Sequence, residues 1–144
     1  MSQKIKIMIL GGARENGKNM YAVQVEDEIF IMDAGLKYPD SSLLGIDVVI
    51  PDLDFFRDYG DKIAGIFLTH GHADSIGALP YILRDYDIPV FGSKLTIELA
   101  KIAVQRENRR RKNDLFHVID ADTEIEFKNA NVSFFKTTHS IPDS

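Results

Sequence analysis

The feature that most constrains the fold of this chain is a strand, loop, helix and strand pattern between residues 63 and 91. Residues 63–69 form the clearest strand in the sequence, and apolar residues then recur at helical spacing over residues 76–85. Residues 88–91 have the character of a second strand. A β-loop-α-β unit of this kind predicts an α/β fold.

Antiparallel β structure is expected before this unit. Residues 5–10 are a β-branched run that ends at Gly11 and Gly12. Residues 21–25 and 29–33 are apolar runs joined by a short polar link, which is typical of a hairpin. Residues 37–60 are loop-like, with a short strand expected over residues 48–50 and a helical turn over residues 54–59.

A long helix and three strands are expected after the unit. Ser93 is placed to cap a helix over residues 94–111. The apolar spacing predicts that its buried face consists of Leu95, Leu99, Ile102 and Ala103. Strands are expected over residues 115–119, 124–127 and 132–136, the last two joined by a turn at residues 129–131. His117, in the first of these strands, is interpreted as structural.

Composition narrows the classes of function. A length of 144 residues allows one domain or a piece of one, and the net charge of −5 provides no overall positive field to attract nucleic acid. The absence of cysteine leaves histidine, aspartate and glutamate as the protein ligands for a metal. No signal peptide or membrane span is evident, so the cytoplasm is the expected compartment. Because the last residues, 140–144, are turn residues directly after a strand, we expect a fragment of a longer protein.

The residues most suited to chemistry follow the strand at residues 63–69. His70 and His72 stand at i and i+2, where extended backbone points both imidazoles the same way, and Gly71 between them permits a tight bend. Asp74 adds an oxygen donor in the next turn. Two surface histidines that lie close by chance are the alternative, but this pattern at a strand end favours a metal site.

The segment His70-Gly71-His72-Ala73-Asp74 resembles the H-x-H-x-D signature of the metallo-β-lactamase superfamily. An ordered set of further segments resembles ribonuclease J, a member of the β-CASP group of that superfamily. These segments are Gly11-Gly12 with Glu15 and Gly17-Lys18-Asn19, then Asp33-Ala34-Gly35, Leu44-Gly45-Ile46-Asp47, Ile50-Pro51-Asp52 and His139-Ser140-Ile141-Pro142-Asp143-Ser144. The similarity extends over essentially the whole chain.

The resemblance implies a fold and a set of site residues. Residues 1–144 would form a partial metallo-β-lactamase domain, the N-terminal half of a four-layer αββα sandwich, without the β-CASP and C-terminal domains. His70, His72 and His139 would bind one metal ion, Zn²⁺ or Mn²⁺. Asp74 would serve a second metal and act in catalysis by orienting or deprotonating the attacking water. Asp33 would support the site loops by hydrogen bonding, and an ordinary turn aspartate is the alternative.

Ser75 departs from the family pattern. Active members continue the motif as H-x-H-x-D-H, and the last histidine binds the second metal. A serine hydroxyl is a poorer ligand than imidazole, so we expect the second site to be weak or empty. The chain then resembles a paralogue with a degenerate metal motif, and whether it retains enzymatic activity is left open.

The implied function is RNA phosphodiester hydrolysis, as a 5′-to-3′ exonuclease with endonucleolytic cuts as a further expectation, in ribosomal RNA maturation and messenger RNA decay. Intrinsic activity is expected to be weak, and absent from the fragment alone. The alternative is a non-catalytic structural or regulatory subunit of an active ribonuclease J complex. A small-molecule metallo-hydrolase is a more remote third option. The implied partners are RNA and an active ribonuclease J paralogue, in a homo- or hetero-oligomer, and no membrane.

Two other patterns receive structural interpretations. Residues 12–18 match G-x-x-x-x-G-K, but Asn19 replaces the serine or threonine of a phosphate-binding loop, and a strand is expected next instead of a helix. A basic cluster near the end of the long helix suits a solvated helix C-terminus, and contact with an RNA backbone is the alternative. This cluster consists of Arg106, Arg109, Arg110, Arg111 and Lys112.

Overall fold

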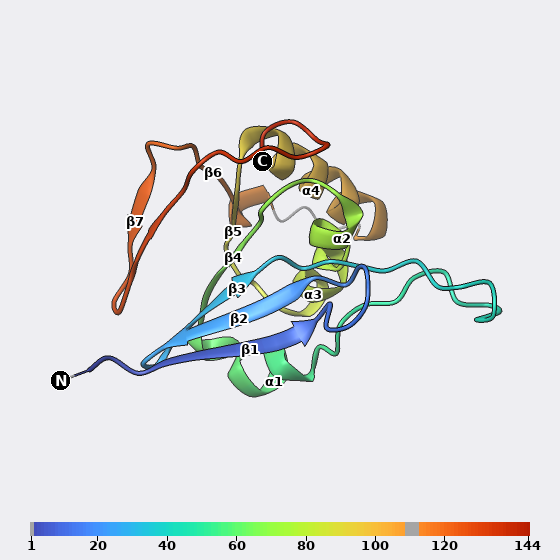
Figure 1. The fold of residues 1–144 in the computed structure, drawn as a ribbon, viewed down its shortest axis with the longest axis horizontal. Coiled ribbons are helices and arrows are strands. Elements are labelled where there is room, and N and C mark those ends of the chain that lie inside the picture. Colours follow the sequence, from blue (N-terminus) through green and yellow to red (C-terminus); the bar gives the residue numbers. More distant parts are fainter. Residues whose placement is uncertain (1, 109–112) are drawn as a thin grey trace.

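The computed structural model describes residues 2–108 and 113–144, and its architecture is a six-stranded sheet with helices on one face (Figure 1). The sheet strands are β1 (Ile5–Gly11), β2 (Met20–Val25), β3 (Glu28–Met32), β4 (Ile63–Phe67), β5 (Val90–Gly92) and β6 (Phe116–Val118). A separate hairpin is formed by β7 (Glu124–Glu126) and β8 (Asn131–Ser133). The helices are α1 (Asp54–Tyr59), α2 (Ala73–Ile76), α3 (Leu79–Asp85) and α4 (Lys94–Glu107), with short 3₁₀ turns at Gly60–Lys62 and Asn113–Leu115. The predicted α/β class is confirmed.

The strands lie in the sheet in their order along the chain. The pairs β1–β2 and β2–β3 are antiparallel, whereas β3–β4, β4–β5 and β5–β6 are parallel. The carboxyl ends of β3, β4, β5 and β6 therefore meet at one edge. In open α/β sheets this edge is where ligands bind.

Two apolar clusters cover the two faces of the sheet. On one face α1, α3 and α4 pack against the sheet around fully buried residues such as Ile31, Phe56 and Leu83. On the other face Phe30 and Phe67 pack against Phe127 and Val132 of the β7–β8 region. Figure 1 shows this hairpin on the side of the sheet away from α2, α3 and α4. The hairpin covers only part of its face.

The single helix expected over residues 76–85 is instead two helices. Ile76 ends α2, and α3 starts anew at Leu79 with Pro80 in its first turn. Proline has no N–H and fits the first turn of a helix but not the interior, so the chain starts a new helix there. The apolar spacing had not revealed this break.

Helix α4 differs from the prediction in length and in orientation. It ends at Glu107, since Asn108 is extended, and residues 109–112, which carry four of the five clustered cations, lie outside the described residues. The predicted buried face was wrong, because Ile102 is 47% exposed. The buried residues are Thr96, Ile97, Ala100 and Val104. The sequence carries two apolar stripes at helical spacing. The stripe that contains Ile97, Ala100 and Val104 packs on the sheet, and the predicted stripe does not.

The remaining differences are local. Val49 forms one isolated bridge with Lys37, where a short strand was expected. Strands β4 and β8 end two and three residues earlier than predicted. His117 is exposed and stacks on Phe91, with ring centroids 5.1 Å apart. Within the described ranges no helix is long and apolar enough to cross a bilayer.

Candidate metal centre

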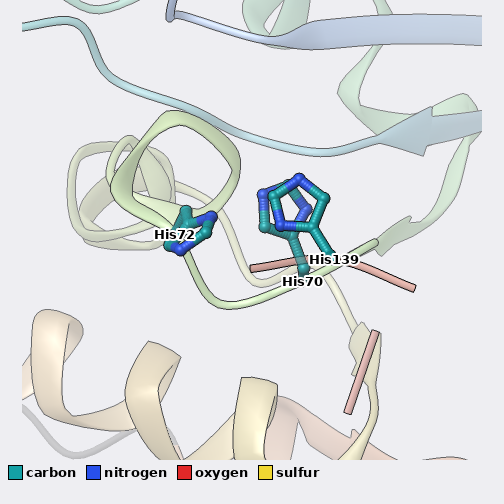
Figure 2. Close-up of side chains that lie close together, drawn as sticks. All are labelled: His70, His72 and His139. Atoms are coloured by element: carbon teal, nitrogen blue, oxygen red, sulfur yellow. The ribbon is translucent and has the colours of Figure 1, made fainter. Parts of the chain in front are cut away.

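Three imidazoles come together beside the carboxyl end of β4 (Figure 2). His70 and His72 come from the loop between β4 and α2, and His139 comes from the segment that follows β8. Their ligand atoms all lie within 4.8 Å of one another. The ring centroids are 4.2 Å apart for His70 and His139, 4.9 Å for His70 and His72, and 5.0 Å for His72 and His139. Three imidazoles at this separation are a set of donors suited to a transition metal.

Asp74 lies beside the three histidines. Its Oδ1 atom is 3.5 Å from Nε2 of His70, and its Oδ2 atom accepts a 3.3 Å hydrogen bond from the side-chain amide of Asn19. Both Oδ1 of Asp74 and Nε2 of His70 are buried, and neither has a hydrogen-bond partner among the described residues. Buried polar atoms without hydrogen-bond partners are rare, and a nitrogen and an oxygen of this kind 3.5 Å apart fit a bound cation.

The protonation of His70 is set by a short chain of hydrogen bonds. Asp33 accepts hydrogen bonds from the backbone N–H and from the hydroxyl of Thr69, both at 2.8 Å, and the same hydroxyl lies 2.8 Å from Nδ1 of His70. A hydroxyl carries one proton, so Thr69 accepts the Nδ1 proton of His70. The lone pair of Nε2 is therefore left free to face the site.

Burial affects both ends of this chain. Desolvation raises the pKa of Asp33 to about 6, although hydrogen bonds from Thr69 and Ser75 oppose the rise. Burial and the neighbouring His139 lower the pKa of His70, so its imidazole is neutral at pH 7. Neutral imidazole is the form that binds metals.

Backbone hydrogen bonds clamp the metal motif against the segment after β3. Ala34 N–H donates to the carbonyl of Ser75, and Leu36 N–H donates to that of Ala73. The two segments are so close that a Cβ added to Gly35 would lie 1.6 Å from the carbonyl oxygen of Asp74. This approach requires glycine, which explains its place after Asp33.

Ser75 is fully buried behind His70. Its hydroxyl lies 3.5 Å from Nδ1 of His70, at the limit of a hydrogen bond. This is the ring nitrogen that the hydroxyl of Thr69 also contacts. The hydroxyl of Ser75 therefore helps to support the imidazole of His70.

The loop at residues 12–18 lies next to the same site. Asn19 contacts Asp74 through its side chain, and its N–H donates to the carbonyl of Asp74. Lys18 and Lys37 both pair with Glu15, at 2.9 and 3.4 Å. Strand β2 follows the loop, so no helix N-terminus is available for phosphates, as predicted.

Sequence reasoning missed two of these supporting residues. Thr69 connects Asp33 to His70, and Asn19 fixes Asp74. A threonine at a strand end and an asparagine in a turn have many ordinary roles, so neither carries a signal that would single it out. Whether the histidines bind a metal stays a prediction.

Comparison with known proteins identifies the family. The model of the metallo-beta-lactamase superfamily matches residues 13–141. The chain is 60% identical over 140 residues to ribonuclease J 2 of Streptococcus pyogenes serotype M3, covering 97% of this chain and 25% of that protein. It is 50% identical over 143 residues to ribonuclease J 2 of Staphylococcus epidermidis, covering 99% of this chain and 26% of that protein.

A solved structure of a B3 metallo-beta-lactamase with an active-site glutamic acid has the same fold over this region. The TM-score is 0.56 at 15% identity, covering 88% of this chain and 47% of that one. The chain spans about a quarter of the length of the curated relatives it matches. It belongs to the metallo-beta-lactamase superfamily and is a homologue of the ribonuclease J 2 proteins.

Proposed function

We propose that this chain forms the metal-binding part of an RNA phosphodiester hydrolase of the ribonuclease J type, with weak intrinsic activity. The observation that carries the proposal is the convergence of His70, His72 and His139, with ligand atoms within 4.8 Å of one another. The names of the relatives suggest RNA as the substrate. The proposed reaction is 5′-to-3′ exonucleolytic cleavage with additional endonucleolytic cuts, in ribosomal RNA maturation and messenger RNA decay.

The roles proposed for the residues follow from their positions. His70, His72 and His139 would hold one ion, Zn²⁺ or Mn²⁺, which when bound supplies positive charge for phosphate oxygens and lowers the pKa of water. Asp33 and Thr69 keep the proton of His70 on Nδ1, so that Nε2 is available. Asp74, held by Asn19, is the candidate to orient the attacking water and accept its proton.

Ser75 is the reason to propose weak activity. Its hydroxyl contacts His70, and serine is in any case a poor ligand for these metals. A two-metal reaction would therefore lack one imidazole at its second site. We propose that the second ion binds weakly or not at all.

The same observation favours a second candidate function. A chain with one incomplete metal site can serve as a non-catalytic structural or regulatory subunit of a complex with an active ribonuclease J paralogue. The oligomer would be homo- or hetero-oligomeric, in the cytoplasm. In both cases the chain is proposed to be the N-terminal half of a metallo-β-lactamase domain, in a protein that also contains β-CASP and C-terminal domains.

Turnover of 5′-monophosphorylated RNA by the full-length protein separates the two functions. The protein is assayed with Mn²⁺, alone and with its paralogue, against Asp74→Asn as the control. Slow hydrolysis that Asp74→Asn abolishes supports the weak hydrolase. No hydrolysis alone, combined with a rate increase of the paralogue that Asp74→Asn leaves unchanged, supports the subunit. RNA turnover equal to that of a relative with the complete H-x-H-x-D-H motif would contradict the role given to Ser75.

A further inference from the structure

The position of His139 raises the question of what holds it in the site. His139 is exposed and lies in an irregular segment after β8, far along the chain from His70 and His72. Its Nδ1 atom lies 3.4 Å from the hydroxyl of Ser140, the next residue in the chain. Its ring otherwise lies beside those of His70 and His72, with centroids 4.2 and 5.0 Å away, and these are the groups that would share the metal.

The segment is held four residues further on, at the N-terminus of α4. The carboxylate of Asp143 accepts a 3.0 Å hydrogen bond from the backbone N–H of Leu95, in the first turn of α4. The hydroxyl of Ser93 donates to the backbone carbonyl of Asp143 at 2.5 Å. The turn that carries His139 is thus tied to one helix by two hydrogen bonds.

Ser93 leaves the capping role to Asp143. Ser93 stands at the N-cap position with extended backbone, but its hydroxyl forms no hydrogen bond to a backbone N–H of the helix. It lies 2.8 Å from the hydroxyl of Thr96 and donates to Asp143. The sequence therefore predicted the right cap position and the wrong capping side chain. Asp143 supplies the acceptor, and its negative charge suits the positive end of a 14-residue helix.

Helix α4 also contacts the loop that carries the other two histidines. A Cβ added to Gly71 would lie 2.5 Å from Cδ1 of Leu99 on α4 and 3.4 Å from Cδ1 of Ile141. The loop of His70 and His72 thus packs closely on α4 and on the segment of His139. The helix is a common support for both halves of the site.

From these contacts we propose that Asp143 is a positioning residue, which brings His139 to the metal by capping α4. The inference rests on the proposed metal site and adds a residue that determines its affinity. Asp143 has a backbone φ of 65°, a conformation that asparagine and glycine adopt with little strain. Asp143→Asn keeps an acceptor and the backbone, whereas Asp143→Gly keeps the backbone and removes the acceptor.

The experiment measures zinc affinity of the full-length protein by calorimetry for Asp143→Gly and Asp143→Asn, each with and without His139→Ala. Asp40→Ala, an exposed aspartate in a loop, is the matched control. We expect Asp143→Gly to weaken zinc binding about tenfold, the size typical of residues that support metal ligands. Asp143→Asn and the control should stay within about threefold of the parent, because asparagine is an equally good cap. In the His139→Ala background, Asp143→Gly should cause no further loss.

Other results would overturn the inference. An unchanged affinity in Asp143→Gly, or the same loss with and without His139, would mean that Asp143 does not act through His139. Circular dichroism of the metal-free proteins identifies a variant that fails to fold. If Asp143→Gly fails to fold, Asp143→Ser, which keeps a shorter acceptor, is measured in its place, again with and without His139→Ala. Failure of the parent protein itself to bind zinc would contradict the proposed function, and is thereby distinct from failure of the positioning role.

Discussion

At the residue scale, the site depends on side chains that contact the histidines from behind. Thr69 joins Asp33 to His70, and Ser75 packs beside the same ring. The histidines themselves could be predicted, because two imidazoles around a glycine at a strand end are an unusual pattern. Their supporting residues could not, since a hydroxyl becomes significant only when the fold places it between two specific groups.

The first prediction concerns Ser75→His in the full-length protein. We expect manganese occupancy of the second site to rise, because a neutral imidazole replaces a hydroxyl beside Asp74. Ser75 is fully buried, so the larger ring should also lower the free energy of unfolding by about 1–3 kcal/mol through crowding. Calorimetric titration of parent and variant measures the occupancy. An unchanged second-site affinity would mean that this position does not face the metal.

The second prediction concerns the pH dependence of stability through Asp33. Its pKa is raised from 3.8 to about 6 in the folded protein, so the folded state binds more protons than the unfolded state between these values. The contribution of Asp33 to stability is therefore greatest below about pH 4 and is lost as pH rises through about 6. Asp33→Asn removes this titration. The stability of the parent relative to Asp33→Asn should fall by about 2 kcal/mol between pH 4 and pH 7.

Urea unfolding of the two proteins at several pH values measures that difference. Gln24→Met, which removes a side-chain hydrogen bond to the backbone carbonyl of Glu26, controls for the removal of a polar group. If the difference in the free energy of unfolding between the parent and Asp33→Asn does not change with pH, Asp33 does not titrate in this range.

At the element scale, the sequence predicted the kinds of elements better than their ends and orientations. The β4 strand, the β2–β3 hairpin and α4 could be recognised from hydrophobic periodicity. The buried stripe of α4 could not, because Leu95 and Leu99 form an apolar stripe as good as that of Ile97 and Ala100. Only packing on the sheet decides between two such stripes, and a contact as distant as that of Asp143 with Leu95 has no local signal.

A prediction at this scale concerns the close approach of the segment after β3 to α2. Gly35→Ala should lower the free energy of unfolding by more than about 2 kcal/mol, because the new Cβ would overlap the carbonyl of Asp74 and displace the metal motif. Gly60→Ala is the matched control, since its nearest contact would be an ordinary 3.7 Å to Tyr86. Chemical denaturation of both variants provides the comparison. Equal stability of the two variants would contradict the close packing of Gly35 on the carbonyl of Asp74.

At the scale of the whole molecule, one face of the sheet is only partly covered. Ile5, Ile7 and Ile9 alternate along β1 and are 61%, 71% and 61% exposed. A cavity of about 520 Å³, with Met32 and Phe67 among its lining residues, lies on the same side as the β7–β8 hairpin. An apolar sheet face of this kind fits the proposal of a partial domain that further chain completes.

We therefore predict that the 144-residue chain by itself self-associates. Sedimentation velocity should show concentration-dependent oligomers, and replacing Ile5, Ile7 and Ile9 by threonine should reduce them while keeping β propensity. Leu44→Thr is the control, because Leu44 is 90% exposed but lies in a loop away from this face. A monomer at all concentrations, or equal effects of the two changes, would contradict the interpretation of this face.

The metal content of the full-length protein tests the central claim most directly. Elemental analysis after dialysis against metal-free buffer should find at most one tightly held Zn²⁺ or Mn²⁺ per chain at the His70, His72 and His139 site. The content should fall close to zero when His70 or His72 is replaced by alanine, while His117→Ala, an exposed histidine on β6, should leave it unchanged. Two tightly held ions per chain, or metal that remains after His70 and His72 are both replaced, would contradict the account.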